Sequence, residues 1–76
     1  METKHIPLTR REAEVMHELA SGLYYKEIAG KIFVSTATVK KHVQNIYKKM
    51  GVKNRTEACL KYRTQLKDYY APLPSK

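Results

Sequence analysis

The chain has 76 residues, of which 42% are hydrophobic, and a formal net charge of +8 at pH 7. A domain of this size buries only about 60% of the surface of its unfolded chain, so a deep catalytic cavity is not expected. No apolar run approaches the roughly 20 residues that cross a bilayer, and the positive charge favours a polyanion such as nucleic acid as partner.

The charge is unevenly distributed along the chain. Residues 1–30 contain four basic and five acidic residues, whereas residues 31–76 contain eleven basic and two acidic ones. This asymmetry predicts one cationic functional surface. Cys59 is the only cysteine, so no disulfide can form within the chain, and the N-terminus lacks an apolar signal segment. The expected location is therefore the cytoplasm.

The first two helices are expected at residues 10–21 and 25–32. Thr9 and Glu12 have the spacing of a capping box, an apolar helical pattern follows them, and Gly22 is placed to end the first helix. The second helix is short. Its inward-facing residues are expected to be Ile28, Ala29 and Ile32.

Two further helices are expected after a tight connection at residues 33–34. Ser35 caps the third, which runs to about residue 50, and Asn54 opens the fourth, which runs to about residue 66. The expected fold is therefore all-α, a compact four-helix domain over residues 8–67 that contains a helix-turn-helix. An arm or linker at residues 1–7 precedes it, and a flexible tail at residues 68–76 follows it.

The helix at residues 36–50 is amphipathic. At about 100° per residue, its apolar side chains fall on one side and its lysines on the other. The apolar stripe contains Val39, Val43, Ile46, Met50 and, at its edge, Tyr47. The opposite side contains Ala37, Lys41, Gln44 and Lys48, flanked by Lys40 and Asn45. From this pattern alone, an ordinary solvated face is as good an interpretation as a binding face.

A short helix, a turn and a longer cationic helix form the arrangement of a helix-turn-helix, whose second helix enters the major groove of DNA. Lys40 and Lys41 can donate to guanine, and Gln44 can pair with an adenine edge. The residues expected to hold the DNA backbone are Thr36, Thr38, Asn45 and Lys48, with Tyr25 and Lys26 from the preceding helix. Simple packing is an equally good interpretation of Tyr25.

Three segments together resemble a known family. "LTRREAEVMHELASG", "KEIAGKIFVSTATVKKHVQNIYKKMGV" and "NRTEA" look like the LuxR-type (GerE-like) helix-turn-helix domain of NarL/FixJ-class response regulators. The resemblance implies that Lys40, Lys41 and Gln44 contact bases, and that residues near Ser35, with Thr38 and Lys26, hold phosphates. It also implies dimerisation through the last helix, where we expect Leu60, Cys59 and Tyr62 at the interface.

The chain departs from this family at two places. Tyr24 and Tyr25 replace the small polar residues that usually begin the second helix, and tyrosine is a poor N-cap. Cys59 and Tyr62 stand where smaller aliphatic residues are common, which leaves the mode of dimerisation open.

The function expected from these features is sequence-specific binding of double-stranded DNA by a bacterial transcription regulator, acting as a dimer on an inverted repeat. RNA polymerase is a candidate partner, and a membrane is not. The alternative is a basic helical module that docks on an acidic protein or on the transcription machinery. His5, His17 and His42 have no cysteine partners at metal-binding spacing. We therefore expect no metal, no cofactor and no enzymatic activity.

Overall fold

The computed structural model describes residues 8–64, which form four helices and no strand. The helices are α1 (Arg10–Ala20), α2 (Tyr25–Ile32), α3 (Thr36–Met50) and α4 (Arg55–Thr64). The predicted all-α four-helix fold is confirmed. α1 ends one residue earlier than expected, because Ser21 is its C-cap. The predicted arm at 1–7, the tail at 68–76 and the continuation of α4 toward residue 66 lie outside the described residues.

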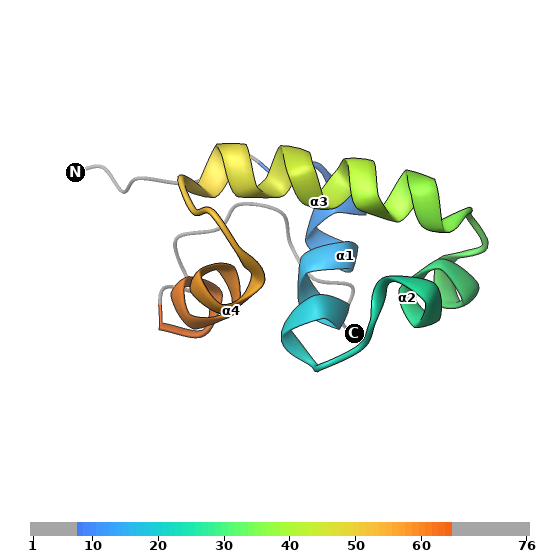
Figure 1. The fold of residues 1–76 in the computed structure, drawn as a ribbon, viewed down its shortest axis with the longest axis horizontal. Coiled ribbons are helices and arrows are strands. Elements are labelled where there is room, and N and C mark those ends of the chain that lie inside the picture. The colour runs from blue at the N-terminus through green and yellow to red at the C-terminus, as the bar shows by residue number, and fades with distance from the viewer. Residues whose placement is uncertain (1–7, 65–76) are drawn as a thin grey trace.

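The helices pack around α1, which contacts each of the other three, and α3 also contacts α2. Figure 1 shows α3 lying across one side of the molecule, with α1 beneath it and α2 and α4 to either side of α1. One side of α3 is therefore covered by the other helices, and the opposite side is open.

The apolar stripe of α3 forms the centre of the core, as its spacing predicted. Val39, Val43, Ile46 and Met50 are all buried, and Tyr47 is half-buried at the edge. The other helices contribute Val15, Met16, Leu19, Ile28, Ala29, Ala58 and Tyr62 to the same cluster. Burying a large aliphatic side chain is favourable by about 1.5–3 kcal/mol, so this cluster fixes which side of α3 faces inward.

Side-chain caps define where three of the helices begin. The Thr9 backbone N–H donates to Glu12 Oε1 at 2.9 Å, and the Glu12 N–H donates to Thr9 Oγ1 at 3.1 Å, which confirms the predicted capping box. Ser35 Oγ accepts from the Thr38 N–H at 3.1 Å at the start of α3. Asn54 Oδ1 accepts from the N–H of Glu57 at 2.9 Å at the start of α4.

The ends of α2 are less regular. The Tyr24 side chain makes no capping hydrogen bond, as expected from the low preference for tyrosine at the N-cap position. The start of α2 is instead capped by the Glu27 carboxylate, which accepts from the Tyr24 N–H at 2.7 Å. At the other end, Phe33 adopts a left-handed conformation with φ of 59° and is 92% exposed. This conformation costs a residue with a Cβ about 1–2 kcal/mol, yet it turns the chain sharply enough for the N-cap of α3, Ser35, to follow two residues later.

Arg55, the first residue of α4, connects three segments. Its Nη2 donates to the carbonyl oxygens of Leu19 at 3.1 Å and Leu23 at 2.9 Å. Its guanidinium carbon lies 5.8 Å from the centre of the Tyr24 ring. Arg55 thus adds a donor to the Leu19 carbonyl at the end of α1, which also accepts from the Gly22 N–H at 3.0 Å, and so attaches α4 there.

Glu12 is the only buried charged side chain among residues 8–64, with 5% exposure. Lys49 Nζ of α3 donates to Glu12 Oε1 at 2.7 Å and so pairs with the carboxylate that also completes the cap of α1. Burial by itself raises the pKa of Glu12, but the hydrogen bonds from Lys49 and Thr9 and the lysine charge outweigh it and hold the pKa below its ordinary value. The carboxylate is therefore a structural anion that joins α1 to α3.

We expect Glu12→Gln to lower the free energy of unfolding at pH 7 by about 1–3 kcal/mol, because the amide cannot replace the charged acceptor of Lys49. The lowered pKa of Glu12 means that its charge stabilises the fold above the unfolded-state pKa, and that this contribution is lost as the pH falls through the folded-state pKa. Urea unfolding between pH 7 and pH 3 should show the wild-type and variant stabilities converging on the acid side.

Glu14→Gln is the matched control, because Glu14 pairs with Arg11 on the exposed surface of α1. Exposed pairs contribute about 0–1 kcal/mol, so this variant should differ little from wild type at any pH. A Glu12→Gln penalty that stayed constant down to pH 3 would contradict the assigned role of the carboxylate charge.

Candidate nucleic-acid interface

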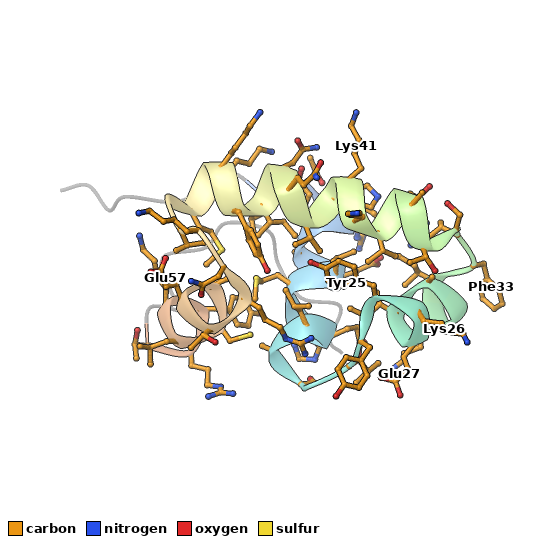
Figure 2. All side chains as sticks on the ribbon, in the orientation of Figure 1. Tyr25, Lys26, Glu27, Phe33, Lys41 and Glu57 are labelled. Carbon is orange, nitrogen blue, oxygen red and sulfur yellow. The ribbon has the colours of Figure 1, made fainter. Side chains whose placement is uncertain are left out.

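The open side of α3 carries a row of cationic and amide side chains. Lys40, Lys41, Gln44 and Lys48 are all exposed, whereas Val43 and Ile46, which alternate with them in the sequence, are buried. In Figure 2, Lys41 points straight away from the other three helices. The angular positions deduced from the helical repeat therefore correspond to the faces in the folded domain.

These lysines are not neutralised by the protein. The ion pairs within residues 8–64 join Arg11 to Glu14, Lys31 to Glu18 and Lys49 to Glu12. None of them involves Lys40, Lys41 or Lys48, and α3 has no acidic residue in its sequence. The face that we call the α3 cationic face (Lys40, Lys41, Gln44 and Lys48) is thus free to pair with an external anion.

Hydroxyl groups surround the start of α3. Ser35, Thr36 and Thr38 are exposed, and the Ser35 and Thr38 hydroxyls lie 2.9 Å apart. The first N–H groups of a helix attract anions, so this end can hold a phosphate. Asn45, on the flank of α3, is half-buried, which leaves it less surface for a partner than the exposed hydroxyl residues at the start of the helix.

The two α2 residues expected at DNA phosphates have different surroundings. Lys26 is exposed, whereas Tyr25 is half-buried and packs against the core. Figure 2 shows Tyr25 between α2 and α3. Burial, with a smaller contribution from the side chain of Tyr25, raises the pKa of the Tyr47 hydroxyl to about 12. Packing is therefore one role of Tyr25.

His42, also on α3, is half-buried.

On α4, the three residues expected at a dimer interface are not equally available. Leu60 is 59% exposed, Cys59 is half-buried with its thiol donating to the Leu19 carbonyl at 3.7 Å, and Tyr62 is only 6% exposed. An open groove of about 390 Å³ lies beside Leu60. The lining residues are Leu19, Ala20, Gly22, Arg55, Thr56, Cys59, Leu60 and Arg63. Tyr62 contributes to the domain's own core, so Leu60 offers a partner the most surface.

Three features of the domain were not predicted from the sequence. Arg55 belongs to the "NRTEA" segment that resembles the family, but nothing in the local sequence indicates that it reaches the end of α1. The Glu12–Lys49 pair joins residues 37 positions apart. The Tyr25–Tyr47 contact also joins two helices, and the only available signal was the unusual pair of tyrosines at the start of α2.

No group of three or more metal-ligating His, Cys, Asp or Glu side chains occurs within residues 8–64. None of the helices α1 to α4 is long and apolar enough to cross a bilayer.

The arrangement is that of a helix-turn-helix domain with an open cationic helix, and comparison with known proteins places it in a family. The model of the bacterial regulatory proteins of the luxR family matches residues 6–62. The chain therefore belongs to the LuxR family of bacterial regulatory proteins and is the DNA-binding domain of a transcriptional regulator. The relatives are transcriptional regulators, a non-enzymatic family, so the chain is not an enzyme.

Individual relatives resemble the chain over most of its length. The transcriptional regulatory protein LnrK of Bacillus subtilis is 49% identical over 55 residues, which cover 72% of this chain and 25% of LnrK. The nitrate/nitrite response regulator NarP of Escherichia coli is 43% identical over 58 residues, which cover 76% of this chain and 27% of NarP. The chain spans about a quarter of the length of these curated relatives.

Two solved structures have the same fold. The response regulator ChrA of a heme-sensing two-component system aligns with a TM-score of 0.74 and 46% identity, over 78% of this chain and 29% of ChrA. The DNA-binding domain of the response regulator ComA, solved in complex with the anti-activator RapF, aligns with a TM-score of 0.68 and 34% identity. That alignment covers 70% of this chain and 91% of the ComA domain.

Proposed function

We propose that this domain binds double-stranded DNA sequence-specifically, with α3 in the major groove. The observation that carries the proposal is the α3 cationic face, which is exposed and free of internal ion pairs while the opposite stripe is buried. Lys40 and Lys41 donate to guanine acceptors and Gln44 pairs with an adenine edge. These side chains lie in the first two-thirds of α3, the part of a recognition helix that meets base edges.

The DNA backbone is held by side chains around this face. The proposed contacts are Tyr25, Lys26, Ser35, Thr36, Thr38, Asn45 and Lys48. Their hydroxyl, amide and ammonium groups, together with the N–H groups that begin α2 and α3, suit phosphate oxygens. Such contacts set the position and register of α3 on the duplex and leave the choice of sequence to the base contacts.

We further propose that two copies bind an inverted repeat through α4. The exposed Leu60 and the groove beside it supply an apolar surface with Cys59 at its edge, and Tyr62 supports this surface from the core. A two-fold pair places its recognition helices about one helical turn of DNA apart. The pair acts in the cytoplasm on chromosomal DNA, where RNA polymerase is a further partner.

Selection of binding sites from a random pool of duplexes tests these proposals together. We expect enrichment of an inverted repeat with half-sites about 10 base pairs apart from centre to centre. The affinity for the selected duplex should fall steeply with salt, with a log–log slope of about −0.9 for each phosphate neutralised. Equal affinity for the selected duplex and a scrambled one would refute sequence-specific binding, and an enriched single half-site would refute the paired arrangement.

A second candidate function is docking on a protein, and one comparison favours it. The DNA-binding domain of ComA, which has this fold, is found in complex with the anti-activator RapF. The basic surface of the present chain would then recognise an acidic partner or the transcription machinery. A nuclease-resistant pull-down combined with no duplex binding at low salt would favour this function over DNA binding.

A further inference from the structure

Ala37 lies on the open side of α3, in line with polar side chains that are proposed to read bases. It is the second residue of α3 and is exposed. Lys41 follows it by four positions and Gln44 by seven, and these spacings place side chains one above another on the same face of a helix. The row on this side therefore begins with an exposed methyl group and continues with an ammonium and an amide group.

The start of α3 holds the methyl group of Ala37 in a defined position. Ser35 Oγ accepts from the Thr38 N–H at 3.1 Å, so the N-cap closes the first turn, in which Ala37 lies. Val39, two residues further on, is completely buried and packs this part of α3 against the core. Because an alanine side chain has no rotamers to choose between, the backbone alone fixes where its methyl group points.

A methyl group on a recognition helix has a matching group in the major groove of DNA. Thymine presents a C5-methyl group there, and alanine is one of the side chains that recognise it by apolar contact. The Ala37 side chain cannot form a hydrogen bond, so it cannot pair with the donors and acceptors of the other bases. Its place in the first turn of α3 also suits base contact, because the N-terminal residues of a recognition helix meet base edges.

We propose that Ala37 determines specificity by placing its methyl group against the C5-methyl group of a thymine in each half-site. This inference rests on the proposed function. Four residues of α3 span about 6 Å and base pairs are about 3.4 Å apart, so the thymine lies about one or two base pairs from the guanine that meets Lys41. Gln44 lies on the other side of Lys41, and its adenine therefore follows the guanine along the groove.

Replacing single thymines of the selected duplex by deoxyuridine tests the contact directly. The replacement removes only the C5-methyl group and keeps the O4 acceptor that thymine presents in the major groove. We expect wild type to bind about fourfold more weakly when the thymine beside the Lys41 guanine is replaced in one half-site, the loss expected for one buried methyl group. Replacing thymines outside the half-sites should change nothing.

A double-mutant cycle between protein and DNA assigns the contact to Ala37. In Ala37→Gly, which lacks the methyl group, the deoxyuridine replacement should cause no further loss. Glycine also weakens the start of α3, but this effect is the same for both duplexes and cancels in the cycle. Ala37→Ser, which keeps a side chain of similar size and adds a hydroxyl, provides a second variant should Ala37→Gly fail to fold in a thermal unfolding assay.

Thr36→Ser and Thr38→Ser are the matched controls. Both threonines flank Ala37 and are exposed, and a threonine methyl group can also contact thymine. Serine removes this methyl group and keeps the hydroxyl proposed for the phosphates, so the fourfold effect of deoxyuridine should persist in both variants. The log–log slope with salt should be the same for thymine and deoxyuridine duplexes, because a methyl group neutralises no phosphate.

The other outcomes overturn the inference in identifiable ways. Half-sites without a thymine at this position, or equal wild-type affinity for thymine and deoxyuridine, would show that Ala37 reads no methyl group. A deoxyuridine effect that persists in Ala37→Gly and disappears in a threonine variant would assign the contact to that threonine. In each of these cases the proposed function stands if wild type still distinguishes the selected duplex from a scrambled one. If wild type does not distinguish them, the proposed function fails and the inference fails with it.

Discussion

We expect Lys41→Ala to bind the selected duplex about 10- to 100-fold more weakly than wild type, and to discriminate less at one base pair. Lys41 points directly away from the rest of the domain (Figure 2), it has no ion-pair partner within residues 8–64, and it lies at the centre of the α3 cationic face. A well-placed contact to guanine contributes about 1–3 kcal/mol of discrimination, which is the source of this loss. Competition gel shifts against duplexes changed one base pair at a time measure both effects.

Two lysine variants provide matched controls for Lys41→Ala. Lys31→Ala removes the same charge from an exposed position that already pairs with Glu18, so it should change affinity by less than about twofold. Lys48→Ala should weaken binding to all sequences alike and reduce the salt slope by about 0.9, as expected for a phosphate contact. Equal losses of DNA affinity for Lys41→Ala and Lys31→Ala would show that only the net charge of the domain matters. In that case α3 would not be the recognition helix.

We expect Arg55→Ala to lower the free energy of unfolding by about 2–3 kcal/mol, a large part of the stability of so small a domain. The substitution removes two charge-assisted hydrogen bonds, to the carbonyls of Leu19 and Leu23, and the contact with the Tyr24 ring. The Leu19 carbonyl keeps the Gly22 N–H as a donor at 3.0 Å, so the loss comes from the removed contacts themselves. Urea unfolding followed by circular dichroism measures the loss.

Arg63→Ala and Arg55→Lys separate the causes of this loss. Arg63 lies exposed on the same helix, so its replacement should change stability by less than about 0.5 kcal/mol. Lysine at position 55 keeps the charge but lacks the planar guanidinium, which directs the two N–H groups of Nη2 at the two carbonyls, so most of the loss should remain. Full stability in Arg55→Lys would show that charge alone, and not the guanidinium geometry, attaches α4 to α1.

The α3 cationic face and the Arg55 connection are linked through the core of the domain. Arg55 fixes α4 against the end of α1, and α1 supports the buried side of α3. Because α3 presents its lysines only while its apolar stripe stays covered, loss of this support would reduce DNA binding indirectly. Measuring the stability as well as the DNA affinity of Lys41→Ala and Arg55→Ala therefore separates damage to the contact surface from damage to the fold.

The sequence by itself predicted the number and order of the helices, because three of the four carry local capping signals for their start. Thr9 with Glu12, Ser35, and Asn54 with Glu57 form their capping bonds within four residues of one another. The face of α3 could be predicted for the same reason, since the helical repeat alone determines that Val43 and Lys41 lie on opposite sides.

Only the tertiary structure decided how the helices are connected and which predicted residues remain available to a partner. Arg55 with Leu19, and Glu12 with Lys49, are more than 30 positions apart, so no local pattern encodes these contacts. Tyr25 and Tyr62 were predicted at external interfaces, but packing buries Tyr25 in part and Tyr62 almost completely. Local hydrogen bonds and the helical repeat are encoded within a few residues of sequence, whereas burial depends on which distant segments the folded chain brings together.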